Sequence, residues 1–366
     1  MRPVTESPVI DGLKVRACTI PTDAPESDGT LEWDATTVVY VEAMSEGVTG
    51  LGWSYCPAVA AGLIEDKLAD LVIGRPAFDR GAAFMAMSAA VRNAGSQGIA
   101  ACAISAVDVA LWDLAARLAG LPLADLIGRC RDGIAVYGSG GFTSYSDERL
   151  TCQLGSWADA GLGMVKMKVG RDAERDPARV RTARAAIGSD VEIFVDANGA
   201  WTAKQALHMA RDFAADGVAW LEEPVTSDDI DGLRLVREQG PPGMAVAAGE
   251  YGFGPDHFRR LLEAGAIDIL QADATRCGGI TGFLQTAALA DAFHVPLSAH
   301  CAPALHLHPC CAVRAAVHME YFHDHVRIES ELLEGTAPLG SGRLTLRDAP
   351  GHGLALRYAA AEHFAV

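Results

Sequence analysis

Positive charge is scarce in this sequence. Its 366 residues include 30 Lys and Arg against 47 Asp and Glu, so the formal net charge is −17 at pH 7. Nucleic-acid phosphates are bound by basic surfaces, and no basic run occurs here, so we expect no nucleic-acid partner. A small anionic substrate is not excluded, since a site can be locally positive within an acidic protein.

Long hydrophobic runs are also missing, although 50% of the residues are hydrophobic. No segment reaches the ~18 apolar residues that a membrane span requires, and the first six residues carry no apolar run of signal-peptide length. The most apolar stretch, 99–115, is interrupted by Asp108 and Asp113 and is typical of a helix packed on most sides. We therefore expect a cytoplasmic globular protein without a membrane partner.

Regular cysteine spacing is the third absence. The nine cysteines follow no repeated pattern, and an odd count in an intracellular protein indicates free thiols. Several histidines and cysteines lie near one another towards the C-terminal end: His306, His308, Cys310, Cys311, His318, His323 and His325. Their spacing fits no usual zinc template, so we expect structural roles for them.

The first third of the chain has the pattern of a small α+β unit. Segments rich in Val, Thr and Ala, bounded by Pro, Gly and Asp, predict antiparallel strands at 4–20, 35–43 and 49–56. The polar segment 21–30 lacks an apolar anchor and predicts a mobile loop. Helical patterns follow at 59–73, 79–93 and 98–119.

From Ile134 onward, short apolar strands alternate with amphipathic helices, with one unit about every 25 to 30 residues. The strands are predicted to end near Gly140, Val169, Asn198, Pro224, Glu250, Asp273, His300 and Phe322. The helices between them are predicted at 146–161, 174–187, 203–216, 227–238, 255–264, 279–292 and 303–315. This alternation predicts an α/β parallel barrel whose last helix is missing or replaced.

Two lysines occupy alternate positions in the apolar stretch 164–170. Side chains alternate along a strand, so Lys166 and Lys168 share one face. In a barrel interior, burial and mutual repulsion would lower a lysine pKa towards neutrality, and such a lysine acts as a base. On an exposed edge strand the same pair would simply be solvated. The residues at the other strand ends decide between these alternatives.

Three carboxylates end three successive predicted strands: Asp196, Glu222 and Glu250. In a barrel, the chemistry lies at the C-terminal ends of the strands, so these side chains are expected to converge. Converging carboxylates require neutralisation, and Mg²⁺ prefers such oxygen ligands while leaving positions open for water and substrate. The pattern therefore predicts a magnesium site.

An acid/base pair is predicted on the next two strands. Asp273 and His300 end neighbouring strands at the same level. A carboxylate on one imidazole nitrogen selects the tautomer and raises the basicity of the other nitrogen. Glu320, on the eighth strand, completes the ring of ionisable side chains. A ligand at the metal would then meet acid/base groups on both faces, the lysines on one and His300 on the other.

With these motifs the sequence resembles the enolase superfamily, mandelate racemase subgroup, over essentially its whole length. The resemblance implies an N-terminal α+β capping domain at 1–130 and a (β/α)₇β modified TIM barrel at 131–340. It also implies a C-terminal segment, 341–366, that returns to the capping domain. Members of the family commonly form even-numbered assemblies, so we expect a homo-oligomer.

The resemblance also implies roles for individual residues. The reaction would be Mg²⁺-assisted removal of the proton α to a substrate carboxylate, giving an enediolate. Lys168 matches the family's base and Lys166 its tuning neighbour, Asn198 matches a substrate contact, and Glu320 matches the acid that hydrogen-bonds the substrate carboxylate. The muconate-lactonising and succinylbenzoate branch carries a lysine where Asp273 stands, so the resemblance argues against that branch.

The outcome of the reaction is left open between several classes. Two predicted cap loops offer hydrogen-bond partners for the hydroxyl groups of a sugar. One carries Asp23, Glu26, Ser27 and Asp28, and the other carries Trp53, Ser54 and Tyr55. These residues favour dehydration of an acid sugar to a 2-keto-3-deoxy acid, with Trp53 and Tyr55 as substrate contacts. Racemisation, epimerisation and lactone cycloisomerisation remain alternatives, as does a catalytically silent barrel kept for binding. The sequence leaves open whether Lys168 or His300 removes the proton.

Overall fold

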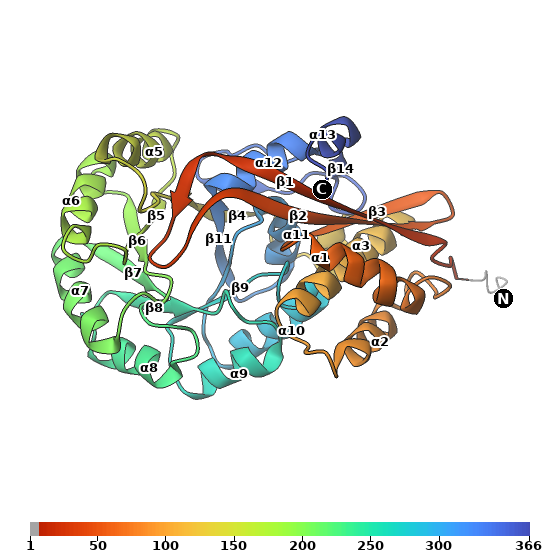
Figure 1. Ribbon diagram of the computed structural model, residues 1–366, viewed down its shortest axis with the longest axis horizontal. Helices are drawn as coiled ribbons and strands as arrows, with labels where there is room; N and C mark the ends of the chain where they lie inside the picture. The colour runs from red at the N-terminus through yellow and green to blue at the C-terminus, as the bar shows by residue number, and fades with distance from the viewer. Residues whose placement is uncertain (1–6) are drawn as a thin grey trace.

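The computed structural model describes residues 7–366 as two parts, a cap and a barrel (Figure 1). The cap contains a three-stranded antiparallel sheet in the order β1-β2-β3, formed by Gly12–Ser27, Glu32–Ser45 and Val48–Tyr55. Its β1–β2 ribbon extends from the cap across the mouth of the barrel towards β5 (Met164–Lys168) (Figure 1). The first predicted strand began at residue 4, and its positions 4–6 lie outside the described residues.

The ribbon corrects the prediction of a mobile loop at 21–30. β1 continues to Ser27 after an irregularity in its pairing, with Glu26 opposite Trp33. Both Glu26 and Ser27 are buried. The polar side chains that suggested a loop find partners on the barrel instead: Ser27 Oγ lies 2.6 Å from Thr143 Oγ1. The segment is therefore ordered by contacts with residues more than a hundred positions away.

The cap helices pack on one face of this sheet. A helical segment comprises α1 (Val59–Leu63) and two short turns to Leu71, followed by α2 (Arg80–Val91) and α3 (Ile99–Leu118). By length and composition α3 could cross a membrane, but most of it is buried against the cap sheet, α2 and α10 (Gly279–Ala292). We interpret α3 as a core helix.

Two glycines in β3 allow α3 to approach the sheet closely. A Cβ atom at Gly52 would overlap the backbone of Ala106 and Ala110, and one at Gly50 would overlap that of Ala110 and Leu114. We expect Gly52→Ala to lower the free energy of unfolding by about 1–3 kcal/mol or more, because the helix must move away from the sheet. Urea unfolding measures this loss.

The control for that prediction is Gly81→Ala, on α2, where an added Cβ meets no atom within 4 Å. It is expected to raise stability by up to about 1 kcal/mol, since Ala has the higher helix propensity. A Gly52→Ala protein as stable as the parent would contradict the close packing of β3 on α3.

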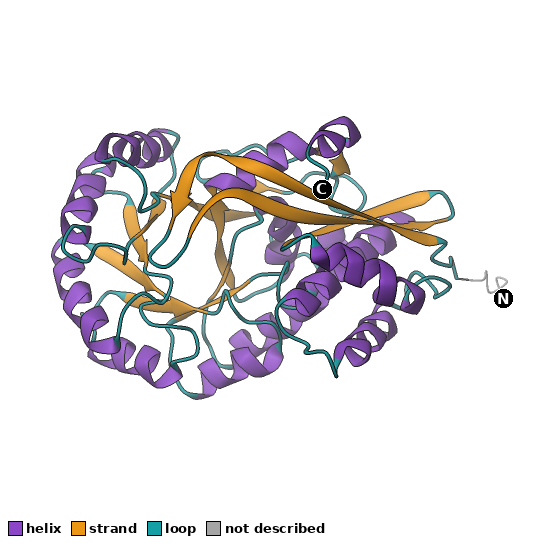
Figure 2. Ribbon diagram, viewed as in Figure 1, coloured by secondary structure: helices purple, strands orange, loops and turns teal. Residues whose placement is uncertain are grey.

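The barrel has eight parallel strands, and β4–β11 pairing closes it. Figure 2 shows helices arranged in an arc around these strands. The strands are β4 (Gly133–Gly140), β5 (Met164–Lys168), β6 (Glu192–Asp196), β7 (Val218–Glu222), β8 (Ala245–Ala248), β9 (Ile269–Ala272), β10 (Leu297–Ala299) and β11 (Ala316–Phe322). The helices are α5 (Asp147–Asp159), α6 (Asp176–Ile187), α7 (Ala203–Ala215), α8 (Ile230–Gln239), α9 (Pro255–Glu263), α10 and α11 (Pro303–Ala312), while the short α4 (Leu123–Ile127) precedes the barrel. The predicted eight-stranded barrel with an N-terminal cap is confirmed.

The helix that follows the last barrel strand was not predicted. α12 (His323–Leu332) follows β11 directly, where the sequence pattern indicated a missing or replaced helix. Its buried positions are Asp324, His325 and Glu329 together with Ile328 and Leu332, so its inner face is only partly apolar. Polar groups on that face bond to the cap and to the turn before α11, for example the hydrogen bond from Thr36 to Asp324. An apolar periodicity therefore does not reveal this helix.

Aromatic rings fill the barrel beneath the strand ends. Phe194 and Trp220 stack with ring centroids 4.9 Å apart, and Tyr137 packs on both. His318 packs against this cluster, and burial lowers its pKa to about 4. Such inward-pointing layers make a barrel a packed core rather than a pore, and here they provide the floor of the polar layer above.

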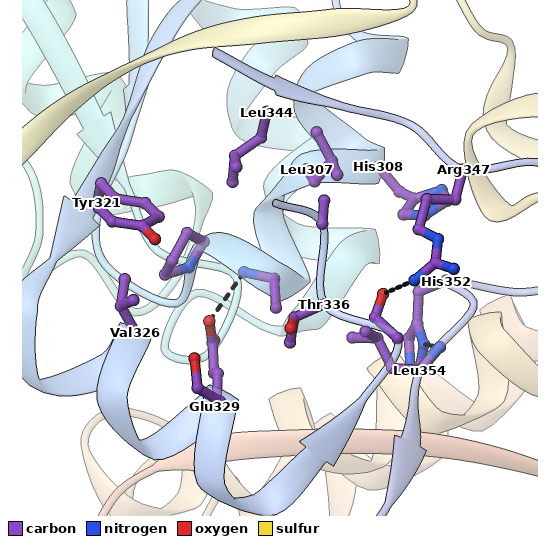
Figure 3. Close-up of a pocket in the computed structure, with 15 residues that line it drawn as sticks. Leu307, His308, Tyr321, Val326, Glu329, Thr336, Leu344, Arg347, His352 and Leu354 are labelled. Carbon is purple, nitrogen blue, oxygen red and sulfur yellow. Dashed lines mark hydrogen bonds between the residues drawn. The ribbon is translucent and has the colours of Figure 1, made fainter. Parts of the chain in front are cut away.

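The C-terminal segment first contacts the barrel and then the cap. β13 (Arg343–Thr345) pairs antiparallel with β4, and β14 (Ala355–Leu356) pairs with β12 (Leu333–Glu334). His352 then bonds the carbonyl of Leu51 on β3, and the carbonyl of Phe364, just after α13 (Tyr358–His363), accepts from β1. A small pocket of about 50 Å³ lies where this segment meets α11 and α12, with His308, Glu329 and Arg347 in its wall (Figure 3).

Candidate active site

A cavity of about 490 Å³ lies between the mouth of the barrel and the cap. The barrel contributes predicted site residues to its wall, and the cap covers it with the β1–β2 ribbon and the end of β3. The barrel residues include Lys168, Asn198, Glu250, His300 and Glu320, and the cap residues include Leu31, Trp33, Thr36, Thr37 and Tyr55. The structure therefore brings together residues that the sequence predicted from separate strands.

Three buried carboxylates form a candidate metal site beside this cavity. Asp196 and Glu222 lie opposite each other at the ends of β6 and β7, and Glu250 follows β8 by two residues. One oxygen from each lies within 4.8 Å of the others. Glu250 Oε2 is buried and accepts no well-aligned hydrogen bond among the described residues, although His300 Nε2 lies 3.2 Å from it. An all-oxygen donor set with an unsatisfied oxygen fits a hard divalent cation such as Mg²⁺.

The lysines of β5 contact these carboxylates, and their charge state corrects the sequence prediction. Lys166 Nζ is 2.5 Å from Glu222 Oε1 and 2.8 Å from Glu320 Oε1, while Lys168 Nζ is 2.5 Å from Asp196 Oδ2. Burial opposes the charged form, but the adjacent carboxylates outweigh it and raise the pKa of both lysines. The predicted fall towards neutrality is therefore wrong beside these carboxylates, because opposite charges, not the other ammonium, are the nearest neighbours.

The predicted dyad has the geometry of an oriented imidazole. His300 Nδ1 lies 2.8 Å from Asp273 Oδ2, and the other oxygen of Asp273 accepts the backbone N–H of Thr275. Burial disfavours the Asp273 carboxylate, but the hydrogen bond with His300 and the charge of nearby Arg276 hold its pKa below the usual range. His300 Nε2 is therefore the nitrogen available for proton transfer, and His300 lines the cavity.

Glu320 and Asn198 complete the predicted set. Ser139 and Lys166 donate to Glu320 Oε1, and the backbone N–H of Cys301 donates to Glu320 Oε2. Asn198 follows Asp196 in a left-handed conformation, with φ of 45°, and its buried Oδ1 has no partner among the described residues. Its position in the cavity wall is compatible with the predicted substrate contact.

The prediction that Trp53 contacts the substrate requires correction. Trp53 is fully buried between Tyr40 and His352 and does not line the cavity, whereas Tyr55 lines it and stacks on His325. We therefore omit Trp53 from the proposed substrate contacts. Both side chains point to the face of β3 that lies away from α3, where Trp53 packs on His352 of the C-terminal segment and Tyr55 reaches the cavity.

The acidic side chains near the β1–β2 turn were also expected to be available for hydrogen bonds with the hydroxyl groups of a sugar, and most of them are not. Glu26 Oε2 accepts from the indole of Trp33, Asp23 pairs with Arg149, and Asp28 Oδ1 accepts two backbone N–H groups within the turn. Among these acidic residues only Asp28 is in the cavity wall. These groups stabilise the turn rather than forming an open row of sugar-binding oxygens.

The sequence reasoning missed Arg276 and the apolar part of the wall. Arg276 lies 3.6 Å from Asp273 and 3.8 Å from Glu250, so it connects the dyad with the candidate metal site. Arg276 could have been predicted from its position three residues after Asp273, in the loop that follows β9. Leu31 and Trp33 of the cap and Phe322 at the end of β11 also line the cavity, and nothing in their local pattern marked them as site residues.

The histidine and cysteine group near the C-terminal end has the expected structural roles where its contacts are described. His306 Nε2 accepts the N–H of Ala274, and His308 Nδ1 accepts that of Ala124. All nine cysteines are free thiols, as predicted.

The metal assignment gives a direct prediction. Glu222→Gln is expected to lower Mg²⁺ affinity at least about tenfold, because a neutral amide replaces one of three anionic ligands. Titration calorimetry measures the affinity, and urea unfolding checks that the barrel is intact. The control is Glu238→Gln, an exposed glutamate on α8. Unchanged Mg²⁺ binding in Glu222→Gln, or an ion held elsewhere, would contradict the assignment.

Comparison with known proteins agrees with this fold. The family model described as "Mandelate racemase / muconate lactonizing enzyme, N-terminal domain" matches residues 17–128, and the one described as "Enolase C-terminal domain-like" matches residues 150–360. The chain is 30% identical over 360 residues to the L-talarate/galactarate dehydratase of Salmonella typhimurium. This alignment covers 95% of this chain and 89% of the relative.

Two solved structures extend the comparison. A mandelate racemase/muconate lactonizing enzyme-like protein from Rubrobacter xylanophilus has a TM-score of 0.96 and 52% identity, covering 98% of this chain and 100% of that chain. A racemase from Streptomyces coelicolor A3(2) with bound magnesium has a TM-score of 0.92 and 30% identity, covering 98% and 100%. The chain therefore belongs to the enolase superfamily, in its mandelate racemase and muconate lactonizing enzyme subgroup.

Proposed function

We propose that this protein removes the proton α to the carboxylate of an acid sugar and then eliminates the β-hydroxyl, giving a 2-keto-3-deoxy acid. The observation that carries the proposal is the placement of two acid/base groups around one cavity. Lys168 is at the end of β5 and His300 directly follows β10, on different sides of the closed barrel, and both line the cavity. A substrate between them has an acid/base group on each face of its α-carbon.

The remaining site residues support this chemistry. An α-proton beside a carboxylate is weakly acidic, so positive charge must be in place for the enediolate. When bound by Asp196, Glu222 and Glu250, Mg²⁺ supplies Lewis acidity and a template for the substrate carboxylate. Lys166 adds a fixed ammonium. Glu320 accepts from Ser139, Lys166 and the Cys301 N–H, and the adjacent Lys166 lowers its pKa despite burial, so Glu320 must take up a proton before it can donate a hydrogen bond to the same carboxylate.

Dehydration is favoured by the similarity to the L-talarate/galactarate dehydratase of Salmonella typhimurium, which aligns over nearly the whole chain. The wall also carries hydroxyl, amide and charged groups that match a polyol acid, namely Thr36, Thr37, Asn198 and Arg276. We propose Tyr55 and Asn198 among the substrate contacts.

A second candidate rests on the apolar wall formed by Leu31, Trp33 and Phe322. Trp33 and Phe322 both pack edge-to-face on Phe142, so this surface is rigid as well as apolar. It suits a substituent without hydroxyl groups, and a 2-hydroxy acid with no β-hydroxyl has no group to eliminate. For such a substrate, return of the proton on the opposite face gives racemisation.

One experiment tests these candidates together. Solvent exchange of the α-proton is measured by NMR in D₂O, with and without Mg²⁺, across a library of sugar acids and of 2-hydroxy acids with alkyl or aryl substituents. We expect Mg²⁺-dependent exchange with keto-acid formation from a sugar acid. Exchange with inversion, confined to the apolar acids, supports the second candidate. No exchange with any acid would leave the catalytically silent barrel and overturn both.

A further inference from the structure

A thiol lies beside the imidazole at the edge of the cavity. Cys301 follows His300 directly, and its Sγ is 3.3 Å from His300 Nε2 and 3.4 Å from Glu320 Oε2. His300 Nε2 and Glu320 Oε2 are 3.8 Å apart. One sulfur, one nitrogen and one oxygen atom therefore form a small triangle, and all three residues are buried.

The dimensions of this triangle match those of a transition-metal site. In tetrahedral zinc sites, metal–ligand bonds of about 2.0–2.3 Å separate neighbouring ligand atoms by about 3.4–3.6 Å. The three observed separations, 3.3, 3.4 and 3.8 Å, differ from the corresponding values by at most about 0.4 Å. Only small side-chain adjustments are needed for all three atoms to bind one ion.

The backbone after β10 prepares the arrangement. Neighbouring side chains on an extended chain point to opposite sides, but Cys301 and Ala302 have left-handed conformations with φ of 52° and 40°. The turn therefore brings Cys301 Sγ to the same side as His300 Nε2. The Cys301 N–H also bonds Glu320 Oε2 at 2.9 Å, which holds this carboxylate beside the thiol.

The imidazole is oriented as it is in metal sites. Asp273 bonds His300 Nδ1, and a carboxylate on the far nitrogen fixes the tautomer and raises the basicity of a metal-binding histidine. All three residues line the cavity. The arrangement thus has three protein ligands, and it borders the three-carboxylate site, because Glu250 Oε2 lies 3.2 Å from His300 Nε2.

The ligand types separate this site from the three-carboxylate site. Oxygen ligands suit Mg²⁺, whereas thiolate and imidazole select softer ions such as Zn²⁺ and Cd²⁺. Lys166 Nζ, 2.8 Å from Glu320 Oε1, and Arg276, 3.6 Å from Asp273, oppose a nearby cation. A hard ion held mainly by charge is thereby disfavoured, while the metal–thiolate bond offsets this repulsion for a soft one.

We propose that His300, Cys301 and Glu320 bind a soft divalent cation, separately from Mg²⁺. As the sulfur–metal bond forms, the Cys301 S–H bond breaks and its proton passes to solvent, with no change of oxidation state. The bound ion occupies His300 Nε2 and Glu320 Oε2, so it excludes the substrate. The protein is therefore sensitive to soft metals at a site that Mg²⁺ does not protect.

Cd²⁺ titration of the Mg²⁺-saturated protein tests the proposal through the ultraviolet charge-transfer absorption of cadmium thiolates. All variants carry Cys130→Ser and Cys152→Ser, which remove the exposed thiols. We expect one Cd²⁺ per chain, retained in excess Mg²⁺. Cys301→Ser should abolish the absorption, and His300→Asn should weaken Cd²⁺ binding at least about tenfold through loss of a ligand. This readout requires no substrate, so it is independent of the proposed reaction.

The matched control is Cys56→Ser, because Cys56 also lines the cavity and its thiol interacts with that of Cys102. This variant is expected to bind Cd²⁺ as the parent does. Absorption that survives Cys301→Ser but disappears in Cys56→Ser would place the ion between Cys56 and Cys102 and overturn the proposal. If excess Mg²⁺ releases Cd²⁺ from both the parent and Cys301→Ser, the Cd²⁺ ion was bound at the three carboxylates. That result would also overturn the proposal.

Discussion

Lys168→Ala is expected to abolish exchange of the substrate α-proton with solvent, while His300→Asn retains exchange and loses product. A positioned acid or base contributes about 10²–10⁴-fold to a rate, and the two groups act on opposite faces of the substrate. If Lys168 removes the proton, which requires Mg²⁺ at Asp196 to offset the carboxylate charge that raises the lysine pKa, its loss stops the first step. The loss of His300 then impairs only protonation of the departing hydroxyl. If His300 is the base, the two phenotypes exchange.

The measurement follows deuterium incorporation and keto-acid formation in the same sample. The control is Lys204→Ala, which removes an exposed lysine on α7 and leaves the cavity unchanged. Mg²⁺ titration confirms that Lys168→Ala still binds the ion at Asp196, Glu222 and Glu250. If Lys168→Ala retains both exchange and turnover, the β5 lysine pair has no acid/base role.

Asp273→Asn is expected to reduce turnover nearly as much as His300→Asn, by about 10²–10⁴-fold. The carboxylate accepts from His300 Nδ1 and leaves Nε2 as the proton acceptor. An amide in its place can present an N–H to Nδ1, which selects the other tautomer and blocks Nε2 with a proton. Nitrogen NMR of the imidazole detects the altered tautomer directly, so a general loss of structure is distinguished from misorientation.

The matched control for this variant is Asp108→Asn, another buried carboxylate. Burial raises the pKa of Asp108 to about 7, and its partners are the hydroxyl and N–H groups of Thr281 rather than an imidazole. We expect this change to affect stability more than turnover. A mild loss of turnover in Asp273→Asn, with the tautomer unchanged, would show that His300 does not depend on the carboxylate.

The positions of the candidate catalytic residues could be predicted because they follow from local patterns. Strand alternation places Lys166 and Lys168 on one face, and the C-terminal ends of parallel strands meet at one side of a barrel. Asp196, Glu222, Asp273 and His300 each lie at, or one residue beyond, the end of a short apolar strand. Their convergence therefore required no knowledge of how distant segments pack.

The tertiary structure alone decided the charge state of the lysines, the surface of the cap and the position of the Cys301 thiol. The pKa values of Lys166 and Lys168 depend on carboxylates from β6, β7 and β11. The β1–β2 turn is ordered by Thr143, a residue 116 positions from Ser27. A periodic pattern reports which residues share a face, but it does not report which distant group that face meets. Burial and Coulomb interactions depend on that distant group, so they appear only once the chain has folded.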